Sequence, residues 1–212
     1  MVCSFRRAGD RMSRMARKKS CTGLYHVMLR GADRRIIFSD DEDNQRFLEI
    51  VQRVKQESLF QLFAYCLMGN HVHLLLREGE EPLGMTFKRI GVSYVYYYNW
   101  KYQLHGHLFQ DRYRSEQVED DAYFLDVLRY ICQNPVKAGL CEKPFEYPWL
   151  GCSGITEDDA FLDSFELFRI NAKSWGATKI LQRNTVHKSF TALKALFQVL
   201  PVDSNHQQGR NP

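Results

Sequence analysis

The sequence lacks the features that mark membrane, secreted and disulfide-stabilised proteins. No apolar run reaches the roughly 18 residues that a membrane-spanning helix needs. Arginines interrupt the N-terminal segment where a signal peptide has its apolar core. None of the six cysteines forms a C-x-x-C pair, so neither a disulfide framework nor a structural zinc site is indicated. We therefore expect a soluble, cytoplasmic protein with no membrane contact and with reduced cysteines.

Internal repeats are also absent, and the composition is that of a globular protein. The 212 residues are 44% hydrophobic and 25% charged, which argues against collagen and against wholesale disorder. A chain of this length buries about two thirds of the surface that its unfolded form exposes. One domain with its own core, together with terminal extensions, is therefore expected.

Positive charge is concentrated at one end of the chain. The net charge is only +4, yet residues 1–35 contain ten Lys and Arg against Asp10 and Asp33, which gives a local charge of +8. Such an arm can neutralise phosphates, or it can be a solvated leader. The pattern leaves both open, and we treat residues 1–20 as a basic flexible leader.

Hydrophobic periodicity predicts alternating strands and helices. Strand-like runs cover residues 24–29, 60–68, 71–77 and 115–118, and helical spacing covers about 40–58, 83–103 and 120–134. Gly69-Asn70 can take the positive φ angles of a tight hairpin, and Asn134-Pro135 is expected to end the third helix. This order predicts a ferredoxin-like α+β domain, with helices packed on an antiparallel sheet. Residues 152–212 are expected to form a C-terminal helical extension with a polar tail.

Two histidines two residues apart form the most informative spacing. In a strand, His71 and His73 share one face, so their neutral imidazoles can converge on one divalent metal. This spacing alone is a weak signal, because His105 and His107 have it too. The second pair flanks a glycine in a predicted loop, where the rings have no common side. The sequence therefore favours His71 and His73 as ligands.

Tyr130 and Asn134 lie four residues apart on a predicted helix, and so on the same face. One interpretation is a half-buried tyrosine and an asparagine that caps the helix. Together with the histidine pair, however, these side chains supply a nucleophile, two nitrogen ligands and an oxygen ligand.

Several stretches carry a resemblance to a known family. They include Tyr25-His26-Val27, Arg30-Gly31, Asn70-His71-Val72-His73, Gly106-His107-Leu108-Phe109-Gln110, Arg129-Tyr130-Ile131 and Asn134-Pro135-Val136-Lys137-Ala138-Gly139-Leu140. With these stretches the chain resembles the REP-associated tyrosine transposases, a branch of the IS200-like, single-tyrosine HUH transposases, over about residues 21–151. The departures are Gly69, where the family usually has proline, and Ala32, where it usually has asparagine.

The resemblance implies a metal-dependent single-stranded DNA endonuclease and strand transferase that cleaves near hairpins through a 5′-phosphotyrosine. Tyr130 would be the nucleophile, with His71, His73 and Asn134 as ligands of Mg²⁺ or Mn²⁺. Single-stranded or hairpin DNA would be the partner. Two alternatives remain open: a catalytically silent DNA-binding regulatory protein that retains the fold, and a metal hydrolase that uses water. A homodimer also remains open, because the tyrosine helix could serve its own histidines or those of a partner.

Basic and aromatic side chains supply candidates for DNA binding. Tyrosines between residues 94 and 102 could stack on bases, although two or three of them must belong to the core because they spread around a helix. They also compete with Tyr130 as nucleophiles, but they lack its neighbouring amide. Surface salt bridges are the alternative role for the candidate phosphate contacts, which are Arg34, Arg35, Lys88, Arg89, Arg112 and Arg114.

Overall fold

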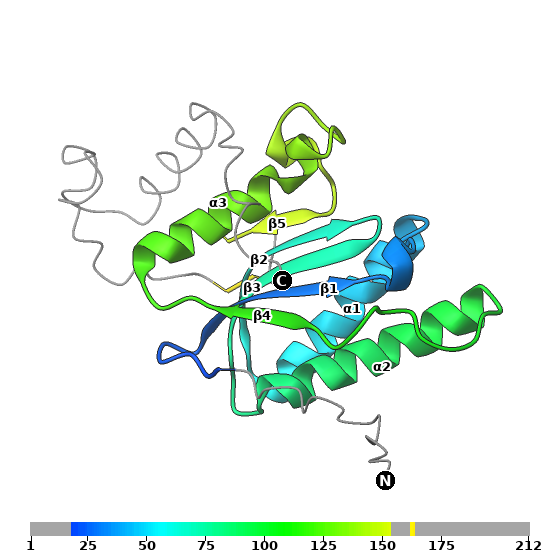
Figure 1. Ribbon diagram of the computed structural model, residues 1–212, viewed down its shortest axis with the longest axis horizontal. Helices are drawn as coiled ribbons and strands as arrows, with labels where there is room; N and C mark the ends of the chain where they lie inside the picture. The colour runs from blue at the N-terminus through cyan, green and yellow to red at the C-terminus, as the bar shows by residue number, and fades with distance from the viewer. Residues whose placement is uncertain (1–17, 154–161, 164–212) are drawn as a thin grey trace, which may run out of the picture.

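A five-stranded antiparallel sheet forms the centre of the computed structural model, which describes residues 18–153, 162 and 163 (Figure 1). The strand order is β4-β1-β3-β2-β5. The strands are β1 (Leu24–Arg30), β2 (Gln61–Met68), β3 (His71–Arg77), β4 (Arg114–Gln117) and β5 (Leu150–Cys152); the helices are α1 (Asp41–Ser58), α2 (Leu83–Lys101) and α3 (Asp121–Lys137), with short 3-10 turns η1 (Ala32–Arg34) and η2 (Pro144–Glu146). The predicted α+β, ferredoxin-like class is confirmed.

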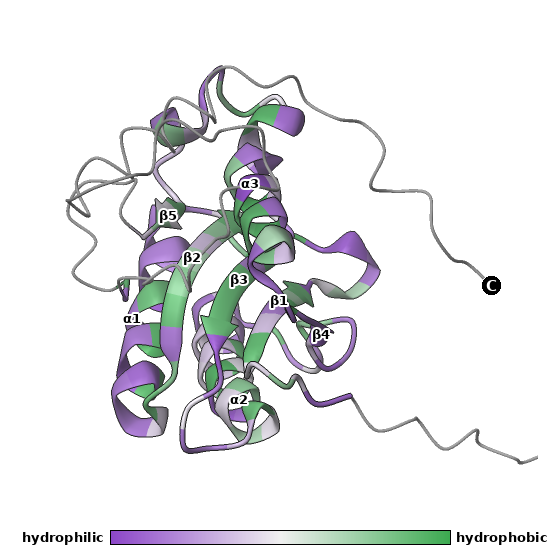
Figure 2. Cartoon of the chain, turned by 90° about the vertical axis from the view of Figure 1, so that its left-hand side faces the viewer, coloured by the Kyte–Doolittle hydropathy of each residue, from purple (hydrophilic) through white to green (hydrophobic). Residues whose placement is uncertain are grey.

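The two faces of the sheet have different covers. One core joins α1 and α2 to alternate residues of the strands, such as Val72, Leu74 and Leu76 of β3. A smaller core joins α3 and β5 to the other face, which includes Leu75 of β3. Figure 1 shows α3 on one side of the sheet and α1 and α2 on the other. Hydrophobic colour is concentrated on the central strands between these layers (Figure 2).

Acidic residues begin two of the helices. The carboxylate of Asp40 accepts a hydrogen bond from the backbone N–H of Asp43 at the start of α1, and Asp120 does the same for Tyr123 at the start of α3. Each bond satisfies one of the free N–H groups of a helix end. None of the described helices is long and apolar enough to cross a membrane.

The third helix does not end at Asn134, so that prediction is wrong. α3 continues through Pro135 to Lys137. A proline in the last turn removes only one helical hydrogen bond. The Pro135 ring is also buried. The helix ends instead where Gly139 takes a φ of +71° and the N–H of Leu140 bonds to the carbonyl of Pro135.

The hairpin at Gly69-Asn70 is as tight as predicted, but neither residue takes a positive φ. The carbonyls of the turn also accept hydrogen bonds from the segment before α1. Gly69 accepts from the N–H groups of Ile37 and Phe38, and Asn70 accepts from that of Gly31.

The tyrosines of α2 are mainly structural. Tyr94, Tyr97 and Tyr98 are buried, and their hydroxyls donate to the Ile37 carbonyl, the Asp43 carboxylate and the Ile36 carbonyl. The prediction that two or three of this group belong to the core is confirmed. All three lie on the face opposite α3.

Strand β5 was missed from the sequence, since three residues are too few for a periodic signal. It pairs antiparallel with β2 at the sheet edge. The predicted leader and C-terminal extension lie almost wholly outside the described residues. Leu162 and Asp163 are exceptions: Leu162 packs on the larger core, and the Asp163 carboxylate accepts from the N–H of Leu62 and binds Lys55.

A disulfide joins Cys132 of α3 to Cys152 of β5. The expectation that all cysteines are reduced is therefore wrong for this pair. The sequence could not indicate it, because the partner cysteine lies in the strand that periodicity missed. The bond fastens α3 to the edge of the sheet.

Reduction of this disulfide should destabilise the protein. The bond closes a loop of 20 residues, so its loss is expected to lower the free energy of unfolding by about 2–4 kcal/mol. Urea unfolding of wild type and Cys152→Ser, with and without dithiothreitol, measures this. The control is Cys21→Ser, which alters an exposed free thiol. If dithiothreitol left the wild-type curve unchanged, the two sulfurs would not be bonded in solution.

Candidate functional site

Three histidines meet on the face of the sheet that α3 covers. β1 and β3 are antiparallel neighbours, with Met28 opposite His73 and Arg30 opposite His71. Strand alternation therefore puts His26, His71 and His73 on one side. The ring centroids of His71 and His73 are 5.0 Å apart, and those of His26 and His73 are 5.2 Å apart.

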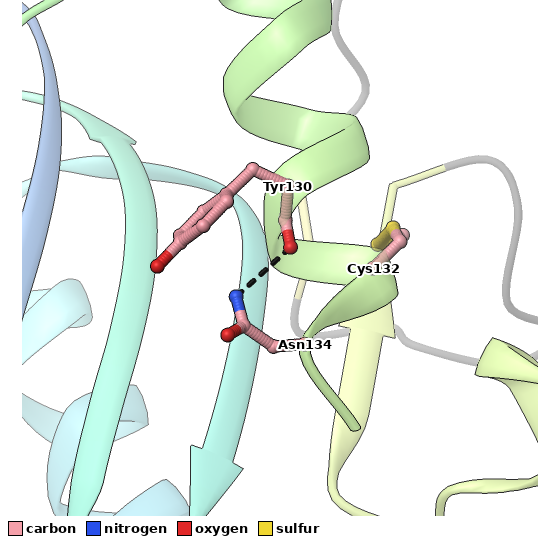
Figure 3. Close-up of a disulfide and its surroundings, with 4 residues drawn as sticks. Tyr130, Cys132 and Asn134 are labelled. Atoms are coloured by element: carbon pink, nitrogen blue, oxygen red, sulfur yellow. Dashed lines mark hydrogen bonds between the residues drawn. A yellow bond between two sulfur atoms is a disulfide. The ribbon is translucent and has the colours of Figure 1, made fainter. Parts of the chain in front are cut away.

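Tyr130 of α3 lies against these rings. Its ring centroid is 5.3 Å from that of His73 and 5.8 Å from that of His26. Figure 3 shows the side chains of Tyr130 and Asn134 on the same side of α3, with Cys132 directed away from them. The Asn134 amide nitrogen donates to the backbone carbonyl of Tyr130 at 2.9 Å. The structure therefore brings the predicted nucleophile to the predicted histidines.

A cavity of about 330 Å³ opens between α3 and the sheet at this point. His26, His73 and Tyr130 line it, together with Glu116 of β4 and Lys137 at the end of α3. The Lys137 ammonium lies 5.6 Å from the centroid of the Tyr130 ring. Charged groups of both signs thus surround the tyrosine.

The tautomer of His71 follows from its neighbour Asn70. The Asn70 amide nitrogen donates to the carbonyl of Arg34 at 3.4 Å, so its oxygen faces His71 Nδ1 at 2.6 Å. An amide oxygen only accepts hydrogen bonds, and Nδ1 must therefore hold the proton. This leaves the lone pair of His71 Nε2 available to a metal ion.

His73 is almost completely buried, with 1% of its surface exposed. Its Nδ1 lies 3.0 Å from Nε2 of His26. Its Nε2 is buried and has no hydrogen-bond partner among the described residues. A buried polar atom without a partner is rare and needs an explanation.

Burial shifts the pKa values of the site residues. It lowers the pKa of His26, His71 and His73, and for His73 the charges of the other two histidines lower the pKa further. Burial raises the pKa of Tyr130, against an opposing hydrogen bond from Asn134. At neutral pH the histidines are therefore uncharged, as metal ligands must be, and Tyr130 is a neutral phenol.

The predicted ligands have donor atoms of the kind that bind a divalent cation. Among the described residues, no three His, Cys, Asp or Glu side chains are grouped to hold a metal. The predicted set is of a different kind, since it has two imidazoles and an amide. The unpartnered Nε2 of His73 and the Nδ1 proton of His71 both agree with ligation through Nε2.

Two site residues were missed from the sequence. His26 stands in one of the matching stretches but was given no role, and Glu116 was not singled out. The Glu116 carboxylate is 3.9 Å from His26 Nδ1. For His26, the sequence signal was a histidine in the middle of an apolar strand. Glu116 could be recognised as a site residue only from the β1–β4 pairing, which places it opposite His26.

The second histidine pair lies elsewhere. His105 and His107 are exposed in the loop after α2, on either side of Gly106, whose φ is +93°. His107 lines a separate groove of about 1080 Å³ with Lys88, Arg112 and the exposed Tyr96. The structure does not bring this pair to Tyr130.

The candidate DNA-binding residues are distributed over several surfaces. Arg114 begins β4 opposite Met28, on the face that carries the histidines. Arg34 and Arg35 are exposed beside the β2–β3 turn, and Lys88 and Arg112 line the separate groove. Arg89 is ion-paired with Glu57 and Glu81, both at 2.8 Å, so the alternative role of a surface salt bridge describes it.

The sequence model of the family described as transposase IS200-like matches residues 19–134. The chain belongs to the IS200-like transposase family. The resemblance inferred from the motifs is thereby confirmed.

One solved structure of a transposase shares the fold, and a second is less similar. A REP-associated tyrosine transposase bound to a REP hairpin superposes with a TM-score of 0.55 and 19% identity, over 66% of this chain and 82% of that chain. A candidate transposase from Deinococcus radiodurans R1 has a TM-score of 0.40 and 17% identity, over 56% of this chain and 95% of that chain. No curated protein matches.

The buried neutral histidines should make the metal-free protein sensitive to acid. The folded state holds the pKa of His73 well below the 6.5 of the unfolded chain. Below about pH 6.5 the unfolded state therefore binds more protons, and the free energy of unfolding falls as the pH falls. Urea unfolding from pH 7.5 to pH 5 measures this slope.

His73→Gln is expected to flatten the slope, and His107→Gln, which alters an exposed ring, to leave it as in the wild type. A wild-type slope that did not respond to His73→Gln would show that His73 does not contribute to it.

Proposed function

We propose that this IS200-like transposase is a metal-dependent single-stranded DNA endonuclease and strand transferase. The observation that carries the proposal is the position of Tyr130, whose ring lies 5.3 Å from that of His73 in one cavity. His73 has a buried Nε2 without a partner among the described residues. A nucleophile beside a nitrogen that can bind a cation is an arrangement suited to metal-assisted cleavage of a phosphodiester by tyrosine.

In this reaction the Tyr130 oxygen attacks the scissile phosphorus. A phosphorus–oxygen bond forms to the tyrosine as the bond to the 3′ oxygen breaks. The phenol proton is lost, and the departing oxygen takes up a proton as a 3′-hydroxyl. The 5′-phosphotyrosine retains the energy of the diester, so that a second 3′-hydroxyl can reverse the step and join the strands.

The raised pKa of Tyr130 makes activation of the phenol necessary. His71 Nε2, His73 Nε2 and the Asn134 amide oxygen are the proposed ligands of Mg²⁺ or Mn²⁺. The cation would supply polarisation of the scissile phosphate and neutralisation of developing charge. Glu116 and Lys137 line the same cavity and are available for proton transfer.

Hairpin DNA is the proposed partner. In support, the structural neighbour described above is bound to a REP hairpin. Arg114 extends the face of the histidines, and Arg34 and Arg35 lie beside Asn70, so these three arginines are the proposed phosphate contacts nearest the site. Tyr130 and His73 of one chain are in ring contact, which supports a site completed within a single chain.

Tyr130→Phe should abolish a covalent adduct with DNA and leave DNA binding within a few-fold, because it removes one oxygen and keeps the packed ring. The assay is an end-labelled hairpin oligonucleotide with a single-stranded flank, incubated with Mn²⁺ and resolved on a denaturing gel.

The matched control is Tyr96→Phe, which alters the exposed tyrosine of α2 and should retain the adduct. An adduct that persists in Tyr130→Phe would place the nucleophile elsewhere. Wild-type binding without any adduct would support the silent regulatory protein, and cleavage without an adduct would support a hydrolase that uses water.

Alanine substitution should separate the two histidine pairs. His71→Ala and His73→Ala are each expected to lose cleavage, because each removes a ligand beside Tyr130. His105→Ala and His107→Ala should affect cleavage less, since those rings are exposed in a loop. Initial cleavage rates at saturating Mn²⁺ measure the difference. A larger loss in the loop variants than in the strand variants would reverse the assignment of the metal site.

A further inference from the structure

His26 has no task in the reaction described so far, although it lies at the centre of the site. It is in the middle of β1, and its ring stacks on that of His73 with an interplanar angle of 26°. Its Nε2 is 3.0 Å from His73 Nδ1, and its Nδ1 faces the Glu116 carboxylate at 3.9 Å. The ring therefore stands between a buried histidine and an acid.

Two arrangements of protons are compatible with this contact. In the first, His73 has its proton on Nε2, which is then a buried N–H with no acceptor among the described residues, and this is unfavourable. In the second, His73 Nδ1 donates to His26 Nε2, and the lone pair of His73 Nε2 faces the cavity. His26 then has its proton on Nδ1, directed to the negative charge of Glu116.

The second arrangement gives the buried N–H of His73 an acceptor and also leaves a nitrogen ready to bind a cation. Ligating histidines usually donate their other N–H to a neighbouring acceptor, which fixes both the tautomer and the orientation of the ring. Asn70 does this for His71. His73 needs an equivalent partner. Among the described residues, the hydrogen-bond partner of its Nδ1 is His26 Nε2.

We propose that His26 is a positioning residue that holds His73 in the Nδ1–H tautomer, so that Nε2 of His73 presents its lone pair to the divalent cation. Glu116 orients His26 in turn. This inference rests on the proposed function, in which His73 is a metal ligand. His26 itself does not touch the metal or the reacting phosphate.

The first test uses the metal-free protein and needs no activity. Nitrogen-15 NMR of the histidine rings distinguishes a protonated ring nitrogen from one with a lone pair. Wild type is expected to show His73 in the Nδ1–H form. His26→Phe, which keeps a ring but removes the acceptor, should shift His73 towards the Nε2–H form that free histidine favours.

His26→Gln should restore the wild-type tautomer, because the glutamine amide oxygen can reach the position of Nε2 and accept the bond. His26→Asn is too short to do so and should resemble His26→Phe. The Gln and Asn pair keeps the proposal testable if His26→Phe does not fold.

The second test measures Mn²⁺ affinity by titration. Loss of a partner behind a ligand typically lowers metal affinity about 10- to 100-fold, and this is the expected effect of His26→Phe. His26→Gln should stay within a few-fold of wild type. Tyr96→Phe is the control, since Tyr96 is an exposed tyrosine of α2.

The outcomes distinguish failure of the metal site from failure of the positioning role of His26. If wild type failed to bind Mn²⁺, the proposed metal-dependent function would fail, whatever the tautomer. If wild type bound Mn²⁺ while His26→Phe kept both its affinity and the Nδ1–H form of His73, the positioning role would be overturned and the metal site would stand. An equal loss in His26→Phe and His26→Gln would also overturn the role, because it would show that bulk at position 26 matters and the acceptor does not.

Discussion

The site depends on the antiparallel pairing of β1 with β3. This register sets His26 diagonally across from His73, so that one imidazole can bond to the other while both face α3. A slip by one residue would turn the β1 side chains to the opposite face and put His26 among the apolar side chains under α1 and α2. The register of β1 against β3 is therefore a condition for the proposed chemistry. The burial of Val27 and Leu29 on the other face helps to enforce this register.

Unequal cover of the two faces explains where the cavity lies. α1 and α2 together bury one face with a large aromatic and aliphatic core, whereas α3 alone covers part of the other. The cavity between α3 and the sheet is lined on the sheet side by residues that include His26, Met28 and Glu116. Polar residues are tolerated there because water or a substrate can reach them, while the same residues beneath α2 would need internal partners.

The sequence predicted much of the fold because the fold depends on local signals. Alternation in residues 71–77 predicted that His71 and His73 share a face, and helical spacing placed Tyr130 with Asn134. Contacts between distant residues were not predictable. The bond from His26 to His73 spans 47 positions, and the Glu116 contact requires the β1–β4 register. Pro135 was misjudged because its effect depends on its distance from the helix end, which Gly139 determines.

The bond between Cys132 and Cys152 limits the freedom of the helix that contains Tyr130. Cys132 lies two residues from the tyrosine, and Cys152 belongs to an edge strand paired with β2. While the bond is intact, α3 and β5 are tied together, so α3 can exchange places with the same helix of a second molecule only if β5 also leaves β2. Under the proposed function, this tie favours a reaction in which α3 keeps its place and the two ends of a cut strand are brought in turn to Tyr130.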